Sequence, residues 1–116
     1  MSGLRASVDR RIRVLIVRRR LEHAATMVER ASGERPRRQR LVVHRLMLLT
    51  AEVPTERWVA AYGLARRAGT VYGETSTVLH SNRAFGDVPE QLVKEWEHVV
   101  ADVENAVEEP FGDQRS

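Results

Sequence analysis

The most constraining feature of this sequence is an amphipathic segment near its end, residues 87–109. It opens with Asp87, a favoured N-cap, followed by Pro89, which suits a first helical turn, and by Glu90, three residues after the cap as in a capping box. Two rows of apolar residues follow at helical spacing: Leu92, Trp96, Val99, Val103 and Ala106, and beside them Val93, Val100 and Val107. A stripe this wide predicts a helix that packs against two neighbouring helices.

Shorter amphipathic segments precede this helix and are separated by proline and glycine. Their periodicity predicts three earlier helices and one short helical piece, over residues 7–31, 36–52, 54–68 and 71–82. Gly33 is the expected C-cap of the first helix, and Gly69 the expected stop of the third. A coiled-coil-like seam in the first helix consists of Val14, Val17, Leu21, Ala24, Val28 and Ala31. An earlier stripe, rotated slightly from this seam, consists of Val8, Ile12 and Leu15.

The fold expected from these segments is all-α, a small helical bundle of four main helices plus one short helix. A chain of 116 residues suits one domain, which we place at residues 1–110, followed by a flexible tail at 111–116. The helix at 36–52 is apolar almost all round and is expected to be the most buried. The predicted core consists of Leu15, Leu21, Val28, Val42, Leu46, Leu49, Trp58, Tyr62, Leu79, Leu92, Trp96, Val99 and Val103.

The amino-acid composition excludes some kinds of site and indicates where in the cell the protein is expected. The chain has no cysteine, so disulfides and thiolate metal sites are excluded. No segment reaches the roughly 18 consecutive apolar residues that a membrane span needs, and the basic start lacks the features of a secretory signal. We therefore expect a cytoplasmic protein with no membrane role. Arginine outnumbers lysine eighteen to one, which is typical of a GC-rich bacterial coding background.

Charge is divided sharply along the chain. Residues 1–45 hold thirteen arginines and four acidic residues, a net charge of +9, whereas residues 46–116 hold six basic and twelve acidic residues, a net charge of −6. One interpretation is a basic face for nucleic acid. Its candidate contacts are Arg18, Arg19, Arg35, Arg37, Arg38 and Arg40. The other interpretation is that the basic half packs beside the acidic last helix, within one chain or across a dimer.

Catalytic motifs are not evident. The four histidines, His23, His44, His80 and His98, include no pair four residues apart and no HExxH pattern. The glycines form neither a P-loop nor a GxGxxG motif, and no nucleophile elbow accompanies the serines. We therefore expect no metal, no cofactor and no catalytic residues.

The segment from Tyr72 to Arg83 carries a partial family resemblance. Tyr72, then Ser76, then Leu79 and His80 stand just before a loop and the last amphipathic helix. In this order they resemble the helical domains of the HEPN superfamily, over roughly residues 58–107. The resemblance implies a helical bundle, often dimeric, of a kind found in ribonuclease toxins, in abortive-infection proteins and in non-catalytic modules of prokaryotic defence systems.

The sequence departs from that family where catalysis would require agreement. Catalytic HEPN ribonucleases carry an arginine separated from the histidine by four to six residues, but the positions so separated from His80 hold Gly73, Glu74 and Thr75. Formal matches occur elsewhere, in Arg18 with His23 and in Arg38 with His44. With so many arginines in the first half of the chain, such matches are expected by coincidence.

The function that these features favour is a non-enzymatic helical interaction module that self-associates, as an accessory component of a bacterial defence or stress-response system. Because the stripe on the last helix exceeds what a small bundle covers, we expect a homodimer or a helical protein partner, with an interface at Trp96, Val99 and Val103. The alternative is a nucleic-acid-binding protein that uses the arginine clusters. A third hypothesis is a HEPN-type ribonuclease that uses His80 or His44.

Overall fold

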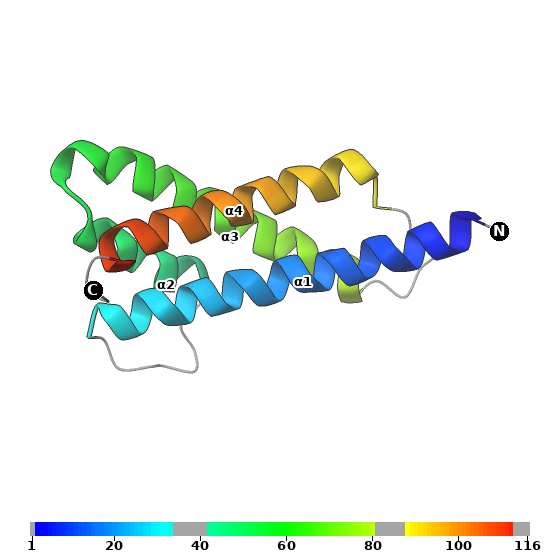
Figure 1. The fold of residues 1–116 in the computed structure, drawn as a ribbon, viewed down its shortest axis with the longest axis horizontal. Coiled ribbons are helices and arrows are strands. Elements are labelled where there is room, and N and C mark those ends of the chain that lie inside the picture. The colour runs from blue at the N-terminus through cyan, green and yellow to red at the C-terminus, as the bar shows by residue number, and fades with distance from the viewer. Residues whose placement is uncertain (1, 34–41, 81–87, 113–116) are drawn as a thin grey trace.

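The computed structural model describes residues 2–33, 42–80 and 88–112, and all the regular elements within them are helices (Figure 1). The α-helices are α1 (Ser2–Ala31), α2 (Val42–Met47), α3 (Trp58–His80) and α4 (Glu90–Gly112). Two short 3-10 helices, η1 (Leu48–Glu52) and η2 (Thr55–Arg57), connect α2 to α3. The prediction of an all-α bundle is therefore confirmed.

The three long helices form an elongated bundle, 49 × 26 × 26 Å in its principal dimensions. Helices α1 and α4 run in the same direction, and α3 runs opposite to both (Figure 1). The short α2 packs on α1 and α3 towards the C-terminal end of α1 (Figure 1). Among the described residues, no helix is long and apolar enough to cross a membrane.

The core lies between α1, α3 and α4 and uses one face of each helix. The predicted seam of α1 is buried from Val14 to Val28, and α4 buries both of its apolar rows. Helix α3 contributes mainly the small side chains of Ala61, Ala65 and Ala68, which allow the neighbouring helices to approach closely. Fully buried side chains of the largest size are Leu21, Leu46, Leu49, Val14, Val17, Val28, Val93, Val100, Val103, Val107 and Thr75.

Gly69 does not stop a helix, which corrects the prediction of a third helix and a separate short one. The two segments form the single helix α3, which passes through Gly69 without a break. A Cβ atom at this position would lie 2.6 Å from the Cβ of Val43 on α2. Glycine is therefore needed here for the close approach of α2, and tertiary packing offsets its low helix propensity.

The ends of the other helices also differ from prediction. Helix α1 begins at Ser2 instead of Ser7, and a positive φ at Gly33 follows its end, as expected of a C-cap. Helix α4 begins at Glu90, where the amides of the next turn donate to the carbonyl of Pro89, and continues to Gly112, so the predicted tail starts inside the helix. The proposed cap Asp87 and the start of the predicted second helix, residues 36–41, lie outside the described residues.

Three members of the predicted core are exposed. Leu15 is 43% exposed, Trp58 46% and Tyr62 38%. Leu15 faces away from the seam of α1, and the rings of Trp58 and Tyr62 stack on each other at a centroid distance of 5.4 Å near the start of α3. Leu79 and Leu92 are partly buried against the core, and the other predicted core residues are buried.

Candidate interaction surface

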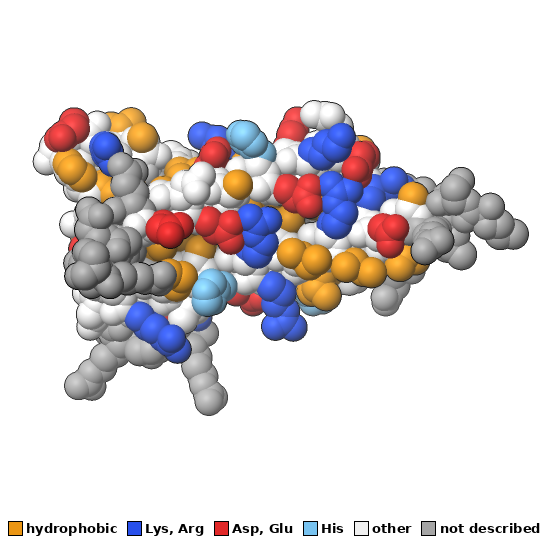
Figure 2. Space-filling view, viewed as in Figure 1, with side chains coloured by type: hydrophobic (Ala, Val, Ile, Leu, Met, Phe, Trp, Pro, Cys, Tyr) orange, Lys and Arg blue, Asp and Glu red, His pale blue; other side chains and the backbone are white. Residues whose placement is uncertain are grey.

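An exposed apolar stripe runs along the N-terminal half of α1 (Figure 2). It consists of Val8, Ile12, Leu15 and Ile16, which are 48%, 51%, 43% and 49% exposed. The spacing of four, three and one places these side chains on one side of the helix, away from the buried seam. We call this set the α1 stripe. Helix α1 is thus apolar on two sides, and the bundle covers one of them.

The α1 stripe continues into a surface hollow between α1 and α4 with a volume of about 330 Å³. It is lined by Leu15, Ile16, Arg19, Arg20, His23 and Glu104. Because apolar residues of the stripe line this open hollow together with charged groups, the hollow suits a side chain of another protein more than a buried small molecule.

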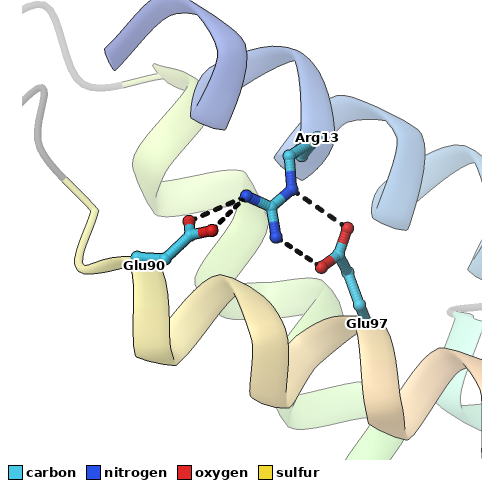
Figure 3. Close-up of polar contacts among 3 residues, drawn as sticks. All are labelled: Arg13, Glu90 and Glu97. Atoms are coloured by element: carbon cyan, nitrogen blue, oxygen red, sulfur yellow. Dashed lines mark hydrogen bonds and ion pairs between the residues drawn. The ribbon is translucent and has the colours of Figure 1, made fainter. Parts of the chain in front are cut away.

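Arg13 of α1 lies between two glutamates of α4 (Figure 3). Its Nη1 donates to the Glu90 carboxylate at 2.6 and 2.7 Å, and its Nη2 and Nε donate to Glu97 at 2.6 and 3.2 Å. These hydrogen bonds raise the pKa of Arg13 and lower the pKa of both glutamates. The prediction that the basic half packs on the acidic last helix is confirmed at this position.

The same contact repeats one heptad further along both helices. Arg20 donates from Nε to Glu104 at 3.0 Å and makes a second contact through Nη2, and the hydrogen bonding raises the pKa of Arg20. We call Arg13, Arg20, Glu90, Glu97 and Glu104 the ion-pair ladder. Because these groups are partly exposed, the ladder contributes more to the register of α1 on α4 than to stability.

A second polar cluster joins α1 to α3 and includes two residues of the HEPN-like motif. The guanidinium of Arg18 lies 4.0 Å from the ring centroid of Tyr72, and its Nη1 donates to Ser76 Oγ at 3.0 Å. The Tyr72 hydroxyl donates to Glu22 at 3.0 Å, and burial together with this glutamate raises the pKa of Tyr72. Tyr72 and Ser76 thus hold two helices together.

His80 occupies the exposed last position of α3. Its Nδ1 lies 2.9 Å from the backbone carbonyl of Ser76, one turn earlier. The formal pair of Arg18 and His23 does not converge, because Arg18 contacts α3 while His23 lines the hollow beside α4. His44 is exposed.

The six arginines predicted to contact nucleic acid differ in their surroundings. Arg18 is engaged within the chain by Tyr72 and Ser76, whereas Arg19 is exposed. Arg35, Arg37, Arg38 and Arg40 lie outside the described residues. Arg13 and Arg20, which belong to the same basic half, are paired with α4.

The predicted interface at Trp96, Val99 and Val103 does not fit their positions. These side chains are 3%, 8% and 1% exposed inside the single chain, and the Trp96 indole nitrogen donates to Glu74 at 3.0 Å. Because α1 covers one side of the α4 stripe and α3 the other, the bundle itself buries it. The exposed apolar stripe of α1 had a signal in the sequence, the rotation of Val8, Ile12 and Leu15 away from the buried seam.

In the part of the chain that the structure describes, no group of three His, Asp or Glu side chains is placed to hold a metal ion. His98 Nε2 lies 3.9 Å from the carboxylate of Asp102 on the exposed side of α4. Comparisons with models of protein families, with curated proteins and with solved structures found no match to this chain.

Proposed function

We propose that this chain is a non-enzymatic helical interaction module that self-associates through the α1 stripe. The observation that carries the proposal is the set of four large apolar side chains, each more than two-fifths exposed, on one side of a helix whose other side builds the core. Contiguous apolar surface of this kind marks interaction sites, because water solvates it poorly and a second surface can cover it.

The polar groups around the stripe support association over catalysis. Arg13 and Arg20 are paired with the glutamates of α4, and Arg18 is engaged by Tyr72 and Ser76 of α3. Their charges therefore oppose the approach of another apolar surface less than unpaired arginines would. Tyr72 and Ser76, the motif residues that could suggest chemistry, are engaged in holding α1 and α3 together.

The partial resemblance to HEPN domains supports the wider role that we propose, an accessory component of a bacterial defence or stress-response system. Non-catalytic HEPN modules serve as such components, and the arginine that the ribonucleases carry, separated from the histidine by four to six residues, is missing before His80. Within this proposal, the chain supplies a helical surface for assembly and no reactive group.

The proposal is tested by the mass of the protein in solution, measured by light scattering across a range of concentrations. We expect the wild type to form a dimer, and we expect Ile12→Asp or Ile16→Asp to yield a monomer with unchanged helical content. Val59→Asp is the matched control, because Val59 is 75% exposed on α3, away from the stripe. A wild-type monomer at all concentrations, or dissociation by Val59→Asp but not by the two α1 variants, would contradict the proposal.

A further inference from the structure

Two charged residues of opposite sign flank the two isoleucines of the α1 stripe. Asp9 precedes Ile12 and Arg19 follows Ile16, and both are exposed. Together with two isoleucines they form the row Asp9, Ile12, Ile16 and Arg19, spaced three, four and three residues apart. This spacing places all four on the same side of the helix. From the N-terminal to the C-terminal end of α1, this exposed row therefore consists of one acidic residue, two apolar residues and one basic residue.

The charges of this row are complementary to those of a second copy only when the two helices run in opposite directions. If two copies of α1 packed in the same direction, symmetry would set Asp9 beside Asp9 and Arg19 beside Arg19 of the second copy, and both contacts would be repulsive. If the copies packed in opposite directions about a two-fold axis, Asp9 of each copy would approach Arg19 of the other. Charge complementarity therefore selects the antiparallel arrangement.

The apolar residues fit the same arrangement. The midpoint of Asp9 and Arg19 and the midpoint of Ile12 and Ile16 both fall at position 14, so the same two-fold axis can relate the charged pairs and the isoleucine contact. Ile12 and Ile16 of one copy then lie against Ile16 and Ile12 of the other. At 1.5 Å per residue, the charges are roughly 15 Å apart along the helix, enough for an apolar contact of about three turns between them.

The neighbouring arginines leave this row available. Arg13 and Arg20 on one flank are held by the ion-pair ladder, and Arg18 on the other flank is held by Tyr72 and Ser76. Within the described residues, neither Asp9 nor Arg19 takes part in these contacts, so both charged side chains are available to a partner surface.

We infer that the partner of the α1 stripe is a second copy of this chain, packed antiparallel along α1, with Asp9 of each copy paired to Arg19 of the other. The inference rests on the proposed function, since it specifies the partner and its orientation on the same surface. In this dimer each ion pair occurs twice, and the pairs fix direction and register while the apolar residues supply the contact.

Charge reversal tests the inference on the whole chain, with the dimer mass and dissociation constant as readouts. Asp9→Arg sets two arginines together twice, and Arg19→Asp sets two aspartates together twice, so each variant alone should dimerise roughly tenfold or more weakly than the wild type. An equimolar mixture of the two variants should regain a heterodimer, and the double variant Asp9→Arg/Arg19→Asp should regain a homodimer. Both positions are exposed, so circular dichroism should show the helical content of the wild type throughout.

The direction of packing has its own readout, because the chain has no cysteine of its own. With Asp9→Cys and Arg19→Cys, which face each other in the proposed register, an antiparallel dimer should form disulfides between the two variants in a mixture, whereas a parallel dimer should form them within each variant alone.

The outcomes separate this inference from the proposed function. A wild-type dimer that Ile12→Asp dissociates but that both single charge reversals leave unchanged would overturn the antiparallel pairing and keep the proposed function. Failure of the folded double variant to dimerise, or crosslinking of Asp9→Cys with itself alone, would also overturn the pairing. A wild type that stays monomeric would overturn both.

Discussion

The guanidinium of Arg13 is joined to the carboxylate of Glu97 by two hydrogen bonds of 2.6 and 3.2 Å, across helices 84 residues apart in the sequence (Figure 3). The paired geometry is the bidentate form that arginine makes with carboxylates. Repeated one heptad later by Arg20 and Glu104, it fixes α1 beside α4 in the same direction. With that register set, the seam of α1 faces the core and the α1 stripe faces outward.

The Arg13–Glu97 contact should make stability depend on pH on the acid side. Hydrogen bonding from Arg13 holds the pKa of Glu97 below its ordinary value of 4.5. The unfolded chain therefore binds a proton more readily than the folded one, so the contribution of the contact is present above pH 4.5 and is lost as the pH falls through the folded pKa. In urea unfolding we expect Glu97→Gln to be less stable than the wild type at pH 7, and the difference to shrink towards pH 3.

Glu95→Gln is the control for this effect, because Glu95 is exposed on the same helix and lies outside the ion-pair ladder. We expect it to change the free energy of unfolding little at either pH. A difference between wild type and Glu97→Gln that stays constant from pH 7 to pH 3 would contradict the prediction.

Gly69→Ala and Gly73→Ala should change stability in opposite directions. The new Cβ at position 69 would meet the Cβ of Val43 at 2.6 Å, so α2 must shift, and overpacking of this kind costs about 1–3 kcal/mol. At Gly73 no atom lies within 4 Å of the new Cβ, so alanine should stabilise α3 by about 0.5–1 kcal/mol through its helix propensity. Thermal or urea unfolding of both variants measures this, and equal effects would show that Gly69 is not a close-packing site.

Removing the hydroxyl of Tyr72 should destabilise the contact of α1 with α3. Tyr72→Phe keeps the ring beneath Arg18 but leaves Glu22 without its donor, and we expect a loss of about 1 kcal/mol in the free energy of unfolding. Glu22→Gln keeps a side-chain oxygen that can accept the hydrogen bond from the Tyr72 hydroxyl. It should therefore lower the free energy of unfolding less than Tyr72→Phe does. A Tyr72→Phe variant as stable as the wild type would show that this hydrogen bond does not stabilise the fold.

Nucleic acid should not change the assembly if the α1 stripe is the functional surface. We expect the mass in solution to stay the same when a short RNA or DNA is added at low salt. The opposite result, a gain in mass that salt reverses and that charge reversal of Arg37, Arg38 and Arg40 abolishes, would instead support the nucleic-acid-binding alternative, because phosphate contacts weaken steeply with salt.

Local periodicity determined much of this fold. The spacing of apolar residues was enough to predict the buried seam of α1 and both buried rows of α4, because each depends on residues within a few turns of one helix. The division of charge likewise predicted that basic and acidic segments could pack together, although nucleic-acid binding remained an alternative interpretation of the same residues. Tyr72 and Ser76 both contact Arg18 of α1, a contact between helices that the sequence did not predict.

Tertiary packing decided the rest, because those features depend on neighbours distant in the sequence. Gly69 is a close-approach site and not a helix stop because Val43 lies against it. Trp96, Val99 and Val103 are core and not interface because α1 and α3 cover them, and Leu15 is surface because the seam on another side of α1 is the one packed into the core. The sequence pattern predicts which sides of a helix are apolar. Which of those sides is buried depends on how the helices pack in the folded bundle.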